Sequence, residues 1–310
     1  MGRRHARILA TLPDRFEVVG VADDDRSRAE ALANAWGVPV LADAAEAIAR
    51  AEIVVVATPI ATHARIAIAA LEAGRDVFVE KPICASSSEA DALVALAARA
   101  GRHLFVGHSE RFNPVVRAMV RLVRGDEVVA LEFHRIGTTA REGECGVLVN
   151  LGVHDLDLAT YLSRSPGEVQ DALGRSLETV GAGEDLAHVL VAMAGGAVGH
   201  VYVDRTSQDK HRTMRVTTTR WVYEGDLLAH RLVRTARTRG KDGKRARVEV
   251  PLVTEEPLLA QALAVADALD GSGVREIATG IDGARALALA ESASERIAAR
   301  QREDAGSVTA

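Results

Sequence analysis

The chain has 310 residues, enough for two domains that each bury a hydrophobic core. Its hydrophobic content of 48% is ordinary for a globular protein, and its formal net charge of −5 argues against a nucleic-acid-binding protein. Two cysteines are too few for a disulfide framework, and no stretch reaches the roughly 18 apolar residues of a membrane span. We therefore expect a cytoplasmic protein with neither nucleic acid nor membrane as a partner.

The chain begins with an expected helix at residues 5–12 and an expected buried strand at residues 17–23. A helix followed by such a strand is the second half of a βαβ unit, and the strand that should precede the helix is absent. That strand is central in a Rossmann sheet, so its loss would forfeit roughly 10 kcal/mol of apolar burial. A whole domain is stable by only about 5 to 15 kcal/mol. We therefore expect the natural protein to start upstream of Met1, with a short strand and two further glycines.

Strands and helices then alternate as far as residue 108. The expected strands are near-continuous apolar runs, as in a parallel sheet covered on both faces, and they occupy residues 17–23, 38–43, 51–59, 76–82 and 103–109. The expected helices between them occupy residues 27–37, 44–50, 62–74 and 86–101. This alternation predicts an α/β domain with a parallel sheet over residues 1–108.

The pattern changes after His108, where a second domain, residues 109–310, is expected. Hydrophobicity alternates with period two in several segments, which predicts an antiparallel sheet with one exposed face, at residues 127–137, 188–206, 212–236 and 245–252. Helical patterns occupy residues 113–125, 149–163, 257–271 and 280–303. An exposed sheet face favours a homo-oligomer. The basic stretch near Gly240 is interpreted as a solvated hairpin tip, and residues 304–310 as a frayed tail.

Gly2 and Asp23 match the second half of a dinucleotide-binding pattern. Gly2 stands where the last glycine of G-x-G-x-x-G would stand, at the start of a helix whose N-terminus would face the pyrophosphate. Asp23 follows the next strand about 20 residues later, the spacing expected of the acidic residue that binds the adenosine ribose. The alternative is an incidental glycine and a turn aspartate.

Lys81 and His154 are the candidates for acid–base chemistry. Lys81 closes a buried strand, and the carboxyl ends of such strands line the ligand crevice, where a lysine can bind a substrate hydroxyl. A surface lysine is the alternative. Asn150 and His154 are four residues apart and share a face of the expected helix. Histidine is the usual general base near neutral pH, which makes His154 the candidate for that role. A structural histidine is the alternative there.

Four sequence blocks, taken together, resemble a known family. In order they are "MGRRHA", "ATPIATHARIAIAALEAGRDVFVEKP", "VGHSERFNP" and "GVLVNLGVHDLDL". Their order and spacing are similar to those of the glucose–fructose oxidoreductase and inositol 2-dehydrogenase family (Gfo/Idh/MocA), from Met1 to about residue 300. The resemblance implies a Rossmann domain, a C-terminal α/β domain with a large, mostly antiparallel sheet, a nicotinamide cofactor, and a sugar or polyol substrate. We expect no metal site.

The resemblance also implies roles for single residues. Lys81 would contact the substrate and His154 would be the catalytic histidine. The positions implied to lie beside the cofactor are Thr58, Pro59, His63, Glu80, Lys81 and Arg111. Asn150 departs from the family pattern, because many members carry Asp four residues before the histidine. An asparagine can orient the imidazole but supplies no charge, so either His154 is a weaker base or Lys81 carries more of the proton transfer.

A narrower resemblance is carried by "GHSERFNP", "EFHRIG" and "NLGVHDLDL". These blocks are similar to the branch that oxidises the C3 hydroxyl of UDP-N-acetylglucosamine. The diphosphate of such a substrate needs cations. The candidates are Arg111, His134, Arg135 and Arg141, and for each of them an ordinary surface charge is the favoured alternative. Asp23 favours NAD, because a 2′-phosphate would meet a carboxylate, whereas Arg26 and Arg28 leave NADP open.

Two other functions stay open from the sequence. One is a different dehydrogenase of the same family, acting on inositol or glucose. The other is a catalytically silent NAD-binding regulator, which the incomplete glycine pattern and Asn150 favour.

Overall fold

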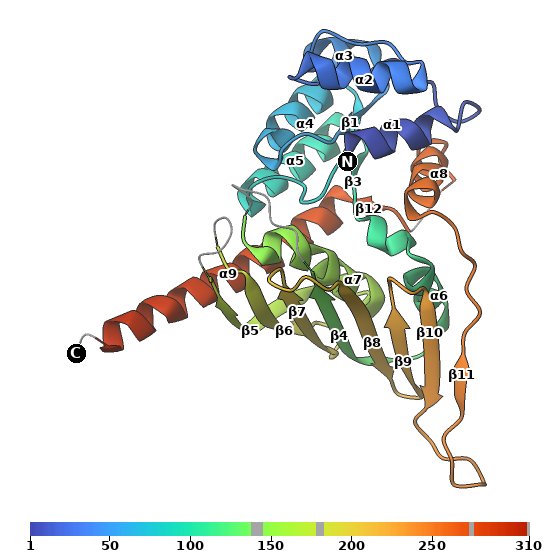
Figure 1. The fold of residues 1–310 in the computed structure, drawn as a ribbon, viewed down its shortest axis with the longest axis vertical. Helices are drawn as coiled ribbons and strands as arrows, with labels where there is room; N and C mark the ends of the chain where they lie inside the picture. Colours follow the sequence, from blue (N-terminus) through green and yellow to red (C-terminus); the bar gives the residue numbers. More distant parts are fainter. Residues whose placement is uncertain (138–144, 178–182, 273–275, 309–310) are drawn as a thin grey trace. The chain divides into compact units, whose positions relative to one another are not determined.

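The computed structural model describes residues 1–137, 145–177, 183–272 and 276–308 (Figure 1). The chain forms two compact units. The first contains Met1–Phe112 and Glu255–Ala284, and the second contains Asn113–Thr254 and the described residues from Arg285 onward. The first unit therefore includes a segment from late in the chain, which a single division at residue 108 does not capture. The predicted NAD(P)-binding domain at residues 1–108 and substrate-binding and oligomerisation domain at residues 109–310 stay a prediction.

The first unit is built on a four-stranded sheet with the order β1-β2-β3-β12. The strands are β1 (Ile53–Val56), β2 (Asp76–Val79), β3 (Leu104–Val106) and β12 (Ala278–Thr279), of which only β12 is antiparallel to its neighbour. The α-helices are α1 (Gly2–Ala10), α2 (Arg26–Trp36), α3 (Ala44–Arg50), α4 (His63–Glu72), α5 (Ser87–Ala100) and α8 (Pro257–Leu269). Two short 3₁₀ helices are η1 (Ile60–Thr62) and η2 (Ser109–Phe112), and α9 (Gly280–Val308) begins in this unit.

Helices cover both faces of this sheet. On one face Phe78 and Phe105 join a buried cluster with residues of α8. On the other face Leu104 and Val106 lie so close to the first turn of α9 that a Cβ added at Gly280 or Gly283 would clash with them. The predicted parallel sheet with helices on both faces is thereby confirmed.

The two expected strands at residues 17–23 and 38–43 are not regular strands. They meet at a single parallel bridge between Val21 and Val40. A regular strand needs continuous backbone hydrogen bonds to a neighbouring strand. Within the described residues β1 is paired only with β2, so neither segment extends the sheet as a regular strand. The additional strand expected next to them is not among the described residues, and its place in the sheet stays a prediction.

The second unit is built on an eight-stranded sheet with the order β11-β10-β9-β8-β4-β7-β6-β5. Its strands are β4 (Val128–Ile136), β5 (Gly167–Arg175), β6 (Leu186–Met193), β7 (Val198–Asp204), β8 (His211–Thr218), β9 (Trp221–Asp226), β10 (Arg231–Ala236) and β11 (Arg247–Glu249). Only β4 and β7 are parallel neighbours. The helices are α6 (Pro114–Leu122), the π-helix η3 (Leu148–Gly152) and α7 (Val153–Ser163), together with most of α9.

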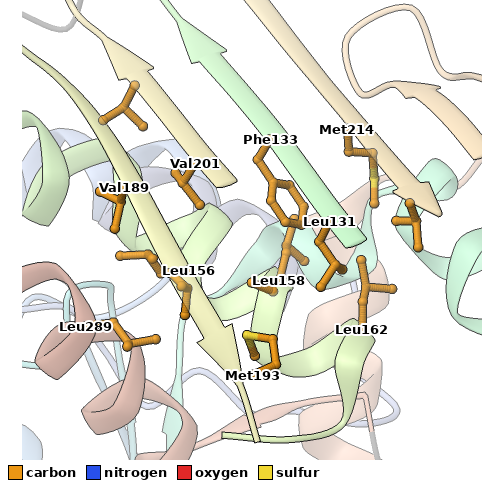
Figure 2. Packing of buried hydrophobic residues seen from close by; sticks show 14 of the residues in the cluster. Leu131, Phe133, Leu156, Leu158, Leu162, Val189, Met193, Val201, Met214 and Leu289 are labelled. Atoms are coloured by element: carbon orange, nitrogen blue, oxygen red, sulfur yellow. The ribbon is translucent and has the colours of Figure 1, made fainter. Parts of the chain in front are cut away.

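One face of this sheet is packed and the other is open. Phe133, Val189 and Met193 point into a core shared with Leu156 of α7 and Leu289 of α9 (Figure 2). The alternate residues of the same strands, such as His134, point to the opposite face. The predicted large, mostly antiparallel sheet with one exposed face is confirmed.

Some details differ from the sequence prediction. Strand β5 was not expected, and the first turn of the expected helix at residues 149–163 is a π-helix. Helix α9 continues to Val308, beyond the end expected at residue 303. The basic hairpin tip between β10 and β11 is exposed, as predicted.

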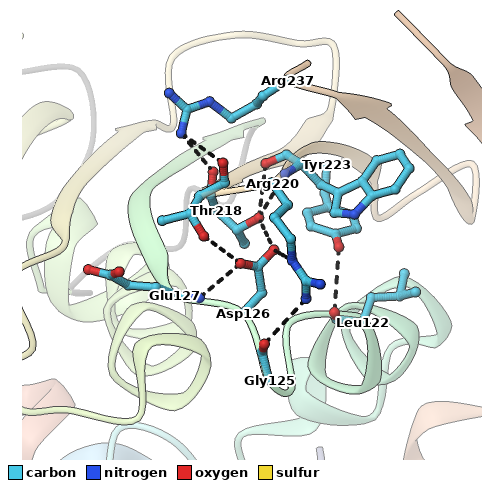
Figure 3. Close-up of polar contacts among 10 residues, drawn as sticks. Leu122, Gly125, Asp126, Glu127, Thr218, Arg220, Tyr223 and Arg237 are labelled. Atoms are coloured by element: carbon cyan, nitrogen blue, oxygen red, sulfur yellow. Dashed lines mark hydrogen bonds and ion pairs between the residues drawn. The ribbon is translucent and has the colours of Figure 1, made fainter. Parts of the chain in front are cut away.

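Asp126 ties the turn before β4 to the hairpin between β8 and β9 (Figure 3). Its carboxylate accepts hydrogen bonds from the Thr218 and Thr219 hydroxyls, both at 2.6 Å, and pairs with Arg220 at 3.3 Å. Burial works to raise the pKa of Asp126, but these donors outweigh it and the pKa is lowered. These contacts fasten the β8–β9 hairpin to the turn before β4, near the middle of the sheet. Over the described ranges, none of the helices combines the length and the apolar character that a membrane crossing requires.

Candidate active site

The ends of β1 and β2 bring two predicted site segments together. The strands are parallel neighbours with Val56 opposite Val79, so the residues that follow them lie at the same edge of the sheet. Thr58 and Pro59 follow β1 and are exposed, and Lys81 follows β2 and is half-buried. This is the edge at which open α/β sheets bind ligands.

His63 fastens these two segments to each other. It is buried at the start of α4, and its Nδ1 lies 2.9 Å from the Pro82 carbonyl oxygen. Its Nε2 lies 2.9 Å from the Thr58 carbonyl oxygen. Both ring nitrogens therefore face backbone oxygens, and the imidazole acts by holding the chain around Lys81. Direct contact of His63 with a cofactor stays a prediction.

Glu80 has a partner that sequence reasoning missed. The Nε2 atom of His5, on α1, lies 2.6 Å from one carboxylate oxygen of Glu80, and the Lys81 N–H donates to the other at 3.2 Å. A Cβ at Gly107 would lie within 2.9 to 3.0 Å of this carboxylate, so the glycine makes room for it. The sequence carried no signal for this contact, because the two residues lie 75 positions apart.

Arg111 is buried in η2 and pairs with Asp282 of α9 at 3.4 Å. Asp282 also accepts hydrogen bonds from the N–H and hydroxyl groups of Thr279 at 2.8 Å, which caps α9. Burial tends to raise the pKa of Asp282, but the Arg111 charge and the Thr279 donors lower it overall. Arg111 is thus held in an ion pair inside the first unit, and its contact with a cofactor stays a prediction.

The first unit fits a dinucleotide at two points. Helix α1 begins at Gly2 without a side-chain cap, so its first N–H groups can face an anion. Asp23 is exposed at the end of its segment, and one carboxylate oxygen accepts the Asp25 N–H at 2.9 Å. The two arginines thought to leave NADP open are already paired with acids, Arg26 with Glu30 and Arg28 with Asp25.

In the second unit, Asn150 lies in the π-helix η3 and His154 lies in the first turn of α7. Both side chains are half-buried, whereas the residues from Asp155 to Ala159 are all buried. The predicted pair therefore has access to solvent at the start of an otherwise buried helix. π-helical turns of this kind occur frequently at functional sites.

One sequence interpretation is wrong. Arg135 was considered as a cation for a diphosphate or a surface charge, but its side chain is 2% exposed and donates two 2.8 Å hydrogen bonds to Asp155. Side chains along β4 point alternately to the open face and into the core, and Arg135 is among those that point into the core. His134 does lie on the open face, beside Tyr202. Arg141 lies outside the described residues.

Two family models match the chain. One, described as an oxidoreductase family with an NAD-binding Rossmann fold, matches residues 1–108, and a second, the GFO/IDH/MocA C-terminal domain, matches residues 124–224. The chain belongs to the Gfo/Idh/MocA family. The expectations of an oxidoreductase and of NAD as its cofactor are confirmed at the level of this family.

Three relatives indicate the range of the family. UDP-N-acetylglucosamine 3-dehydrogenase from Acidithiobacillus ferrooxidans is 28% identical over 217 residues, which are 70% of this chain and 67% of that protein. Its solved structure has a TM-score of 0.87 at 25% identity, covering 96% of this chain and 94% of that one. Inositol 2-dehydrogenase 2 from Saccharopolyspora erythraea is 34% identical, but the match spans only half of each protein, 52% of this chain and 50% of that one. GenD2 from gentamicin A biosynthesis, solved with NAD, is 26% identical with a TM-score of 0.81 and covers 96% of this chain and 91% of that one.

Proposed function

We propose that this protein oxidises a secondary hydroxyl of a nucleotide sugar with NAD, and that the substrate is UDP-N-acetylglucosamine, oxidised at C3. The observation that carries the proposal is the placement of Lys81 at the carboxyl end of β2, fastened by His63 to the loop after β1. The likeness to UDP-N-acetylglucosamine 3-dehydrogenase over almost the whole of both chains supports the choice of substrate.

The roles of the side chains follow from their chemistry. His154 takes the proton of the reacting hydroxyl, and the Lys81 ammonium stabilises negative charge developing on its oxygen. Asn150 orients the imidazole of His154 without adding charge. NAD, when bound, accepts the hydride that leaves the carbon, so that one proton and one hydride are removed and a ketone forms.

The geometry favours NAD over NADP. Asp23 would accept hydrogen bonds from the ribose hydroxyls, and it would repel a 2′-phosphate. The nearby Arg26 and Arg28 form exposed ion pairs with Glu30 and Asp25. We expect Asp23→Ala to narrow the preference for NAD over NADP, as measured by the ratio of kcat/KM for the two cofactors.

The test is a screen of nucleotide sugars and polyols for NADH formation by the full-length protein. UDP-N-acetylglucosamine should be oxidised, and Lys81→Ala and His154→Ala should each lose about 100-fold or more in turnover. Exposed residues supply matched controls, Lys241→Ala and His211→Ala, which should retain wild-type turnover. Full activity in either site variant would contradict the assigned roles.

A polyol dehydrogenase is the second candidate, favoured by the 34% identity to an inositol 2-dehydrogenase. Activity with free inositol or glucose and none with nucleotide sugars would select it. Binding of NAD without oxidation of any sugar would instead select the silent regulator.

We also propose that the open face of the eight-stranded sheet binds a second copy of the chain. Its apolar part carries Leu173, Leu190 and Val198, which are 54%, 45% and 58% exposed. Farther along the face, charges of alternating sign lie directly opposite each other on neighbouring strands, in the order Glu132, Arg215, Glu224. A surface that carries both positive and negative charges as well as an apolar patch can be complementary to the same surface on a second copy of the chain.

A further inference from the structure

The segment that carries Asn150 and His154 is held on both sides by buried charged residues. On the far side of His154, Arg135 of β4 donates from Nε and Nη2 to the two oxygens of Asp155, both at 2.8 Å. Both side chains are almost completely buried. Since β4 lies well inside the sheet order, this two-point contact fixes the first turn of α7 to the interior of the sheet.

The backbone that precedes Asn150 is held by Glu184. Its side chain accepts the Leu148 N–H at 3.0 Å, and its backbone oxygen accepts the Val147 N–H at 2.8 Å. The Ser294 hydroxyl donates to the same carboxylate at 3.3 Å. Glu184 therefore occupies the N-terminal end of η3, where the backbone N–H groups lack helical partners.

A second buried ion pair holds the backbone at Cys145, shortly before η3 begins. Arg205 pairs with Asp185 at 2.7 Å, and its Nη1 donates to the Cys145 carbonyl oxygen at 2.9 Å. Thus the backbone is held at Cys145, at residues 147–148 and at Asp155. Asn150 and His154 lie between these points.

We infer that Arg135 and Asp155 are positioning residues for His154. Apolar side chains of similar size commonly replace a buried ion pair without loss of stability, so stability alone does not require the pair. What apolar packing does not supply is the fixed direction of two parallel hydrogen bonds. The direction of these hydrogen bonds sets the rotation of the first turn of α7 about its axis. It thereby sets the orientation of the half-buried imidazole of His154, one residue before Asp155. The inference deepens the proposed function and rests on His154 as the base.

The test compares two double variants in the full-length protein. Arg135→Met/Asp155→Leu removes the buried pair, and Arg300→Met/Asp171→Leu removes an exposed pair at 2.6 Å in the same unit. We expect the first to lower kcat by about 10- to 100-fold while the KM for NAD changes less than twofold. The second should leave both unchanged. Wild-type kcat in a folded Arg135→Met/Asp155→Leu protein would overturn the inference.

An NMR measurement decides the point without any substrate. The Cε1–H resonance of His154 is assigned by its loss in His154→Gln, and its position and titration midpoint should both move in Arg135→Met/Asp155→Leu. If that variant does not fold, Asp155→Asn, which keeps the shape of the side chain, takes its place. An unchanged resonance would overturn the inference, whereas a moved resonance in a protein that oxidises no sugar would support it and count against the proposed function alone.

Discussion

In the first unit, single side chains serve mainly to hold the backbone around the candidate site in place. His63 spans the carbonyl oxygens of Thr58 and Pro82, and Asp282 pairs with Arg111 while capping α9. The sequence identified the positions of His63 and Arg111 through the family resemblance. It did not identify their partners, because these are backbone atoms or residues far away in the chain.

Replacement of His63 tests its bridging role. His63→Leu leaves the carbonyl oxygens of Thr58 and Pro82 without the ring nitrogens, so the free energy of unfolding should fall by about 1 to 3 kcal/mol. His63→Gln should lose less, because its amide can still donate to one of the two oxygens. The measurement is urea denaturation at equilibrium. Equal stability of His63→Leu and the wild type would show that the bridge contributes nothing.

Asp282 makes a pH-dependent contribution. Its pKa is lowered in the folded protein, so the stabilisation is present at neutral pH and is lost as the pH falls through the folded-state pKa, below the ordinary value of 3.8. Asp282→Asn should therefore lower Tm by about 2 to 4 °C at pH 7, and its difference from the wild type should shrink towards pH 3. Thermal scans across this range check it, and a difference that grows on acidification would contradict the assignment.

At the scale of elements, the positions of β1, β2 and β3 were predictable, whereas their ends and the local distortions were not: each of these strands ends three residues before its expected end. Lys81 was expected to close the strand at residues 76–82, and it follows the observed end of β2 at Val79 by two residues. The π-helix at Leu148–Gly152 could not be predicted, whereas the inward direction of Arg135 could have been, because Arg135 alternates in step with Leu131 and Phe133. The π-helix is capped by Glu184, 36 positions after Leu148, and a contact of that kind leaves no periodic trace. The segment at residues 17–23 has the pattern of a strand, yet without a continuous ladder it forms only one bridge.

The cap on η3 gives a prediction at this scale. A Cβ at Gly146 would lie 2.4 Å from a carboxylate oxygen of Glu184, so Gly146→Ala should push that side chain away from the Leu148 N–H. We expect a Tm several degrees below that of Gly199→Ala, a control in β7 whose added Cβ would meet its nearest atom at 3.4 Å. Differential scanning calorimetry of the two variants compares them, and equal Tm values would contradict the account of the cap.

For the whole molecule, the open sheet face is the surface that the period-two pattern predicted. The pattern showed which residues alternate, but not that His188 and Tyr202 stack with ring centroids 4.3 Å apart, which depends on strand register. If this face binds a second copy, Leu190→Glu and Val198→Glu should reduce the mass measured by light scattering to that of a single chain. Leu228→Glu, an equally exposed leucine outside the strands, is the control. A wild-type protein that is already a single chain would contradict the proposed assembly.

The imidazoles on this face predict a pH dependence. Burial, followed by the charge of neighbouring histidines, lowers the pKa of His188 and of His200 below the ordinary value of 6.5. The folded protein therefore favours the neutral rings, and the stability that they contribute is lost as the pH falls below about 6.5. Between pH 7.5 and 5 the Tm of the wild type should fall, and the double variant His188→Asn/His200→Asn should fall less. An identical slope would show that these rings do not titrate in this window.

If, as we propose, this protein removes a hydride from C3 of a nucleotide sugar, a label at that position must reach the nicotinamide cofactor. The most direct test supplies the full-length protein with UDP-N-acetylglucosamine deuterated at C3, together with NAD, and follows the label by mass spectrometry. The account predicts that the deuterium appears in the reduced cofactor, and that Lys81→Ala and His154→Ala slow its transfer by about 100-fold or more. Reduced cofactor without deuterium, or sugar that keeps its label throughout, would contradict it.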